Sequence, residues 1–140
     1  MSSTLAIIKP DAVEARNVGL ILAMLEKENF RIRAARFLQL DDTQAGEFYA
    51  VHRERPFYEA LKTFMTSGPV MTLALERDDA VAHLRRVIGA TDPAEAEPGT
   101  VRAFYAENKE RNAIHASDSD ENATKELAFF FSFRELLGSG

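Results

Sequence analysis

His115 and the acidic residues that follow it are the part of the sequence best suited to chemistry. The chain has three histidines, and only His115 follows a short apolar pair and precedes a polar helix start, in the segment NAIHASDS at 112–119. A helix predicted over about 120–131 places Glu126 at the margin of an apolar stripe. A carboxylate there needs a partner, because its desolvation costs on the order of several kcal/mol. An upstream imidazole N–H would satisfy it and leave the other ring nitrogen nucleophilic. The alternative is a core histidine with a purely structural hydrogen bond.

Basic residues scattered through the chain could bind anions. The candidates are Lys9, Arg55, Arg85 and Arg102, and Thr91 lies in the same irregular stretch as Arg102. Guanidinium groups form paired hydrogen bonds with phosphate oxygens, and phosphoryl transfer needs such groups around an in-line nucleophile. The alternative is that each of these residues is a solvated surface charge.

Composition and missing motifs exclude several other functions. The sequence contains no cysteine, which excludes disulfides and thiolate chemistry and fits the cytoplasm. Its net charge of −5 argues against binding nucleic acid through a basic field. The histidines lack the close spacing of metal ligands, and no dinucleotide-binding, P-loop or Gly-x-Ser-x-Gly motif is present. Any bound nucleotide would therefore be held by scattered side chains. Tyr49 and Phe57 are expected, on pattern alone, to be core or rim aromatics.

The length of the chain predicts one domain over 1–137, with GSG at 138–140 as a flexible tail. An apolar content of 46% and a charged content of 28% are ordinary for a globular protein. The apolar run LAII at 5–8 is too short for a signal peptide or a membrane span, so no membrane association is expected.

An alternation of strands and helices is expected to position these residues. Apolar runs and alternation predict strands over 4–8, 30–35, 70–75 and 113–115, with a bulge or a change in burial near 36–38. Helical spacing predicts helices over 18–28, 43–52, 57–66, 80–88 and 120–131, with a cap at 78–79 and a capping box at 117–120. The segment 89–112 is predicted to be a long irregular loop. This order indicates an α+β fold, a ferredoxin-like β-α-β-β-α-β antiparallel sheet with added helices and a long active-site loop.

Five blocks spread over nearly the whole chain make it similar to the nucleoside diphosphate kinase family. In chain order the blocks are IKPD at 8–11, RPF at 55–57 with SGPV at 67–70, GATDP at 89–93, PGTVR at 98–102, and Asn112 with His115 and SDS at 117–119. The histidine block is specific by itself, and agreement of all five in order makes chance a poor explanation.

The resemblance implies transfer of the γ-phosphate of a nucleoside triphosphate to a nucleoside diphosphate, by a ping-pong mechanism through a phosphohistidine. His115 would be the nucleophile, Glu126 would hold its tautomer, and Ser117 would support Glu126. Phe57 would stack on the base, which would explain broad tolerance of base and sugar. Magnesium would be carried by the nucleotide phosphates, without a metal site in the protein. Contacts to phosphates, ribose or the transferring group would come from Lys9, Tyr49, Arg85, Thr91, Arg102 and Asn112.

The resemblance also implies a homo-oligomer, commonly a hexamer in the family and a tetramer among bacterial members. The composition adds the expectations of a cytoplasmic location and of no specific nucleic acid as a partner. Two positions depart from the family pattern, because Ala116 and Glu110 stand where glycine is usual. If position 116 needs a positive φ, alanine adds strain of ~1 kcal/mol, and Glu110 would place an acid near a phosphate site. The alternatives are a non-catalytic ferredoxin-like module that binds a nucleotide or nucleic acid, and an inactive family member that serves as a scaffold.

Overall fold

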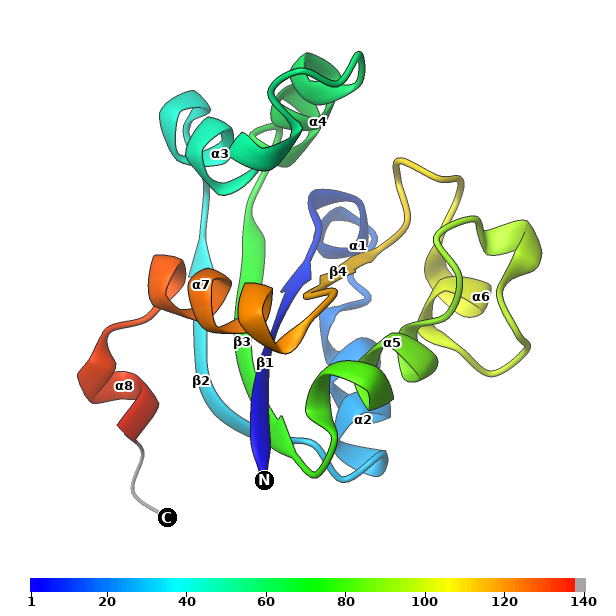
Figure 1. The fold of residues 1–140 in the computed structure, drawn as a ribbon. Coiled ribbons are helices and arrows are strands. Elements are labelled where there is room, and N and C mark those ends of the chain that lie inside the picture. Colours follow the sequence, from blue (N-terminus) through cyan, green and yellow to red (C-terminus); the bar gives the residue numbers. More distant parts are fainter. Residues whose placement is uncertain (138–140) are drawn as a thin grey trace.

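A four-stranded antiparallel sheet forms the centre of the protein (Figure 1). The computed structural model describes residues 1–137, so the tail predicted at 138–140 lies outside the described residues. The strands are β1 (Ser2–Ile8), β2 (Arg31–Leu38), β3 (Val70–Arg77) and β4 (Ile114–Ala116), and their order across the sheet is β2-β3-β1-β4. This order and the antiparallel pairing confirm the predicted ferredoxin-like α+β fold.

The central strand β1 is apolar on both faces because helices cover both sides of the sheet. Ala6 and Ile8 pack in one buried cluster with α2 (Val18–Lys27) and α5 (Ala80–Ile88). Leu5 and Ile7 alternate with them and pack in a second cluster with α7 (Asp120–Phe130). Figure 1 shows α7 lying across β1 and β3. The strand that precedes Lys9 is thereby fixed from both sides.

The remaining helices are short. They are α1 (Pro10–Glu14), α3 (Asp42–Phe48), α4 (Tyr58–Met65), α6 (Val101–Tyr105), α8 (Phe133–Leu137) and the 3₁₀ helices η1 (Ala50–His52) and η2 (Pro93–Glu95). The helix α3 starts at a capping box, since the Asp41 carboxylate accepts the N–H of Gln44 and the Gln44 side chain accepts the N–H of Asp41.

Two local predictions were wrong, and a third was right only in part. The register shift in β2 falls between Ile32 and Ala34 rather than near 36–38, where burial alone changes. The helix α7 begins after Ser119, whose side chain accepts the N–H of Asn122, so its cap is a single serine rather than a capping box over 117–120. The segment 89–112 contains η2 and α6 and is therefore not irregular throughout, because Thr100 caps a short helix there.

One helix was also missed, and one helix cap was misjudged. The final helix α8 was not predicted, although Ser132 and Glu135 form a capping box in which each side chain accepts the other residue's N–H. Conversely, Asp79 precedes α5 with a left-handed φ of 53°, and its side chain makes no cap hydrogen bond to that helix. A capping sequence therefore marks a helix start only where the backbone points the side chain at the first turn.

Candidate active site

The strand β4 and the helix α7 bring His115 and Glu126 together. Nε2 of His115 lies 2.9 Å from Oε1 of Glu126, and the Ser117 hydroxyl donates to the same oxygen at 2.7 Å. Because an ionised carboxylate only accepts hydrogen bonds, Nε2 carries the ring proton and Nδ1 keeps its lone pair. The two side chains are 20% and 21% exposed, so water screens this hydrogen bond only partly. The hydrogen bond predicted between these residues is present.

His115 lines a cavity of about 560 Å³ whose walls come from α3, η1, β4, α5 and α7. The rings of Phe48 and Tyr49 meet the imidazole edge-on, with centroids 5.5 and 6.2 Å from it. These contacts and the hydrogen bond to Glu126 leave the ring little freedom to turn. The charged side chains on the cavity wall, besides Glu126, are Glu47, Arg85, Asp118 and Lys125.

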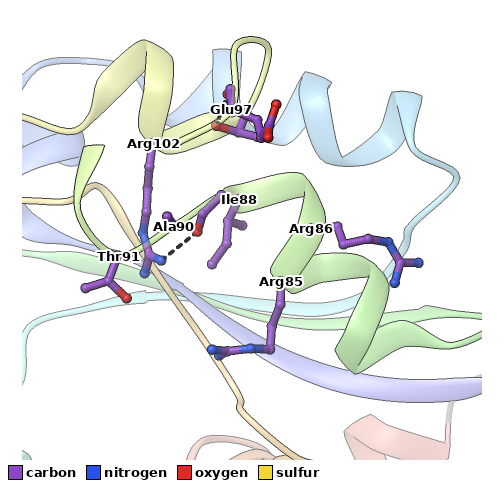
Figure 2. A pocket seen from close by; sticks show the side chains of 9 residues that line it. Arg85, Arg86, Ile88, Ala90, Thr91, Glu97 and Arg102 are labelled. Atoms are coloured by element: carbon purple, nitrogen blue, oxygen red, sulfur yellow. Dashed lines mark hydrogen bonds between the residues drawn. The ribbon is translucent and has the colours of Figure 1, made fainter. Parts of the chain in front are cut away.

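A second cavity, of about 530 Å³, lies between α5 and the segment that carries α6, and Arg85 lines both cavities. Figure 2 shows Arg85 and Arg102 extending to the same side of the second cavity, with Thr91 near Arg102, whereas Arg86 points away. Three residues predicted to contact phosphate therefore share one cavity, and one of the three also reaches the cavity of His115. The other two candidate cations, Lys9 and Arg55, line neither cavity.

Arg102 is buried at the start of α6 and binds three backbone carbonyl groups. Its guanidinium donates to the carbonyl oxygens of Gly89 at 3.0 Å, Asn112 at 3.3 Å and Ile114 at 2.7 Å. Burial, and then the charge of Arg85, lowers the pKa of Arg102 to about 10, so the group stays charged at neutral pH. Arg102 thus ties the end of α5 to the segment that leads into β4, and two of its five N–H groups are left for other partners.

Lys9 is buried at the end of β1, with an exposed fraction of 8%. The alternative of a solvated surface charge is therefore wrong for this residue. Its Nζ donates to Oδ1 of Asn112 at 2.8 Å, and the Asn112 amide donates to the carbonyl of Thr91 at 3.3 Å. Burial, and then the charge of Arg102, lowers the pKa of Lys9 to about 8. These contacts join β1 to the segments before β4 and after α5.

The two aromatic candidates differ in exposure. Tyr49 is buried, and its hydroxyl has no hydrogen-bond partner within residues 1–137. Burial raises the pKa of Tyr49, with a further contribution from the charge of Glu126. Phe57 is 48% exposed, and its ring centroid lies 5.3 Å from that of His52, which stacks on Tyr49. Tyr49 is thus a core residue beside His115, and Phe57 presents an apolar ring at the surface.

The strain considered for Ala116 does not occur there. Ala116 lies in β4, and the residue of this segment with a positive φ is Ala113, at 75°. Hydrogen bonding with β1 keeps position 116 extended, so a residue with a Cβ fits. Glu110 is exposed, and its charge raises the pKa of Lys9 slightly, after larger opposing effects.

Several side chains on the wall of the His115 cavity were not identified from the sequence. Asp118 and Asn122 are four residues apart, and the Asn122 amide donates to the Asp118 carboxylate at 2.6 Å. This hydrogen bond is the main reason why the pKa of Asp118 lies below its usual value. Asp118 lies just before the predicted helix and Asn122 in its first turn, so their spacing across the helix start could have revealed this pair, whereas the position of His52 beside the cavity depends on the fold.

No group of three or more His, Cys, Asp or Glu side chains that could hold a metal ion occurs within residues 1–137. In the same part of the chain, no helix is long and apolar enough to cross a membrane.

The sequence matches one family of known proteins over nearly its whole length. The sequence model of the nucleoside diphosphate kinase family matches residues 2–136. The chain is 53% identical to the nucleoside diphosphate kinase of a Nitratiruptor species over 137 residues, which cover 98% of this chain and 100% of the relative. It is 52% identical to that of Chlorobium chlorochromatii, over 99% of both chains.

Solved structures of the same family superpose on the fold. The Aquifex aeolicus nucleoside diphosphate kinase matches with a TM-score of 0.94 and 47% identity, over 96% of this chain and 97% of its own. The Halobacterium salinarum enzyme in complex with CDP matches with a TM-score of 0.91 and 36% identity, over 96% of this chain and 90% of its own. A match that spans nearly the whole chain in both sequence and fold leads to one conclusion: the chain belongs to the nucleoside diphosphate kinase family.

Proposed function

We propose that His115 is the residue that carries phosphate in the reaction of this family, the ping-pong transfer of a γ-phosphate from a nucleoside triphosphate to a nucleoside diphosphate. The observation behind this assignment is the hydrogen bond from Nε2 of His115 to Glu126. This hydrogen bond occupies Nε2 and leaves the lone pair of Nδ1 available for attack. The ring lines the larger of the two cavities. Ser117 supports the arrangement through its bond to Glu126.

The transfer needs no separate general base. In the first half-reaction, the Nδ1 lone pair of His115 bonds to the γ-phosphorus while the bond to the β-phosphate oxygen breaks, and the diphosphate leaves with that electron pair. The ring keeps its Nε2 proton and gains positive charge, which Glu126 offsets. In the second half-reaction, a terminal oxygen of the acceptor diphosphate attacks the same phosphorus, and the phosphorus–nitrogen bond breaks.

Phosphate binding is assigned to cations and polar groups that line the two cavities, and to Lys9 and Asn112, which are linked to the second cavity by the hydrogen bond from Asn112 to Thr91. The negative charge in phosphoryl transfer is spread over several oxygens, so positioned cations and hydrogen-bond donors supply most of the catalysis. Arg85 contributes to both cavities, and the Tyr49 hydroxyl has no partner among the described residues and suits an oxygen of the transferring group. The residues in this assignment are Lys9, Tyr49, Arg85, Thr91, Arg102 and Asn112.

Phe57 is assigned to the base. An exposed ring offers a face on which any base can stack without hydrogen bonds to the base edge, and this supports broad tolerance of bases. The Halobacterium salinarum relative was solved with CDP, which agrees with nucleotide binding in this fold.

Magnesium is assigned to the nucleotide rather than to a site in the protein. This ion keeps several waters and needs only one or two carboxylates besides substrate phosphates. Asp118, on the wall of the His115 cavity, fits such a limited contribution. When bound, the ion would neutralise phosphate charge.

A homo-oligomer is supported by one edge of the sheet. Within residues 1–137, β2 is an outer strand of the sheet that pairs with β3, and Arg33 and Arg36 on it bond to α8. Phe37 on this strand is 59% exposed. An edge strand with an exposed aromatic residue suits pairing with a second copy of the chain. The lack of cysteine agrees with a reducing compartment such as the cytoplasm.

The assignment is tested by incubating the protein with γ-labelled ATP. The unaltered protein should gain a label that is labile in acid and stable in base, and this label should move to added diphosphate. His115→Gln should fold, as judged by circular dichroism, and gain no label, because an amide cannot form the phosphorus–nitrogen bond. Turnover in that variant near the unaltered rate would exclude His115 as the carrier.

The same experiment addresses the non-catalytic alternatives. A binding module or an inactive scaffold would bind nucleotide and gain no label even with His115 intact. No contact in the described residues favours these alternatives over phosphate transfer.

A further inference from the structure

Asp11 lies beside the active site without a role in the chemistry assigned above. Its exposed fraction is 4%, and its Oδ2 accepts the backbone N–H of Ala113 at 3.0 Å. Its other oxygen has no hydrogen-bond partner within residues 1–137. Burying a carboxylate is costly, so a buried carboxylate with one such bond requires an explanation.

Its partner Ala113 is held in a strained turn. The φ of Ala113 is 75°, in the left-handed region that disfavours residues with a Cβ. The N–H of Ile114 donates to the carbonyl of Asn112 at 2.9 Å, so 112–114 forms a γ-turn of the rare, strained kind. Such a turn persists only where its surroundings hold it in place.

The turn is held from both sides by the segment that follows β1. The N–H of Lys9 donates to the carbonyl of Ala113 at 2.9 Å, while Asp11 accepts the N–H of the same residue. On one side of the turn, the Asn112 side chain meets Nζ of Lys9 at 2.8 Å. On the other side, β4 begins, and it carries His115 two residues after Ala113. One turn therefore fixes the positions of both Asn112, which is assigned to phosphate binding, and His115, the nucleophile.

We infer that Asp11 is a positioning residue for phosphate transfer, whose carboxylate holds the strained turn at Ala113 and thereby places His115 and Asn112 relative to Lys9. The inference rests on the proposed role of His115. It requires an acceptor oxygen at position 11 rather than a charge, because the bond to Ala113 needs only an acceptor. Burial raises the pKa of Asp11, and the hydrogen bond from Ala113 and the charges of Lys9 and Arg111 oppose this rise only in part.

The inference is tested with Asp11→Ala and Asp11→Asn in single-turnover phosphorylation of His115 by γ-labelled ATP. At saturating ATP, Asp11→Ala should lower the rate constant about 100-fold, since a displacement of about 1 Å is enough for such a loss. Asp11→Asn keeps an oxygen that can accept from Ala113 and should stay within about 5-fold of the unaltered protein. An unchanged rate in Asp11→Ala, or equal losses in both variants, would overturn the inference.

A second substitution tests the strained turn directly. Glycine adopts a positive φ without strain, so Ala113→Gly should make the turn less dependent on Asp11. Asp11→Ala combined with Ala113→Gly should recover at least about 10-fold of the lost rate. If Asp11→Ala alone does not fold, the double variant should fold and transfer phosphate. A double variant that is as slow as Asp11→Ala, or that also fails to fold, contradicts the inference.

Two controls separate positioning from other effects. Leu25→Ala opens a cavity in the buried core at α2 and should lower the melting temperature without lowering the rate constant of the folded protein. A comparable rate loss in Leu25→Ala would mean that Asp11 affects the rate only through the general stability of the protein. His115→Gln is measured alongside, because a label in that variant contradicts the carrier role itself. A full rate in Asp11→Ala with no label in His115→Gln contradicts only the role of Asp11.

Discussion

At the scale of single residues, the site depends on charged groups that are removed from water. The pKa of Lys9 is lowered to about 8 and that of Arg102 to about 10, in both cases chiefly by burial. The charges of Asp11 and Glu110 offset this lowering for Lys9 only in part, so its buried ammonium group destabilises the fold but attracts phosphate strongly. This pair of cations therefore favours ligand binding at some cost to stability.

The lowered pKa of Lys9 predicts a pH dependence. Below about pH 8 the lysine of the free protein is charged and attracts phosphate, and above it the charge is lost, so kcat/KM for ATP should fall as the pH rises through about 8. Lys9→Arg keeps a charge at high pH, so it should lower kcat/KM overall but abolish this fall. Measured pH profiles of kcat/KM check both expectations. A decline near pH 8 that persists in Lys9→Arg would point to another group.

The role of Glu126 predicts a loss in turnover rather than in binding. Glu126→Ala removes the acceptor of the His115 ring proton, so kcat should fall on the order of 100-fold while nucleotide affinity changes little. Steady-state kinetics and equilibrium binding measure the two effects. Glu121→Ala is the matched control, since Glu121 lies on the same helix, is exposed and pairs with Lys125. An unchanged kcat in Glu126→Ala would show that this glutamate is only structural.

At the scale of secondary-structure elements, the approach of α5 to α6 builds the second cavity. Gly89 ends α5 with a φ of 89°, and a Cβ added there would lie 2.5 Å from Oγ1 of Thr100, the residue that caps α6. The carbonyl of Gly89 also accepts a hydrogen bond from Arg102. Glycine is needed here both for its φ and for the close approach of the two helices.

A pair of glycine substitutions separates these two requirements. Gly89→Ala should lower the free energy of unfolding by about 3 kcal/mol and weaken nucleotide binding, because it forces Thr100 and α6 away. Gly99→Ala has a similar φ of 90° but no atom within 4 Å of the added Cβ, so it should cost only about 1 kcal/mol. Denaturant unfolding compares the two. Equal losses of unfolding free energy in the two variants would mean that the positive φ alone sets the cost, without a contribution from the contact with Thr100.

At the scale of the whole molecule, the sheet ends in two different edges. The strand β4 is three residues long and is followed by Ser117 and α7, whereas β2 has eight residues and, within residues 1–137, pairs with another strand on one side. A long edge strand attracts other chains unless it is covered. Pairing of β2 strands between two copies would extend the sheet across the interface.

This geometry predicts which substitution changes the oligomeric state. Phe37→Lys places a charge on the exposed side of β2 and should reduce the mass of the assembly in solution. Val51→Lys is the control, since Val51 is 85% exposed but lies on η1 outside the sheet, and its variant should keep the original mass. Light scattering coupled to size-exclusion chromatography measures both. An unchanged mass for Phe37→Lys would exclude β2 as the interface.

The order of strands and helices follows from the sequence alone. Periodicity and caps act over a few residues, so β1, β3, α2 and α7 were predicted close to their observed bounds. The residue types that suit phosphate chemistry, and the blocks shared with the family, are also visible without a structure. Predictions failed at short elements such as α6 and α8, where a few capping contacts decide the conformation.

Which side chains of the site are buried, and with which residues they form hydrogen bonds, was decided only by the tertiary structure. Lys9 and Asn112 are 103 residues apart, and their hydrogen bond exists because β4 pairs with β1. The same pairing strains Ala113 and buries Asp11, and no local pattern signals either feature. The sequence determined which groups were available for chemistry. The long-range pairing of strands determined which of these groups are buried and which of them contact one another. The reason is that desolvation depends on segments that are distant along the chain.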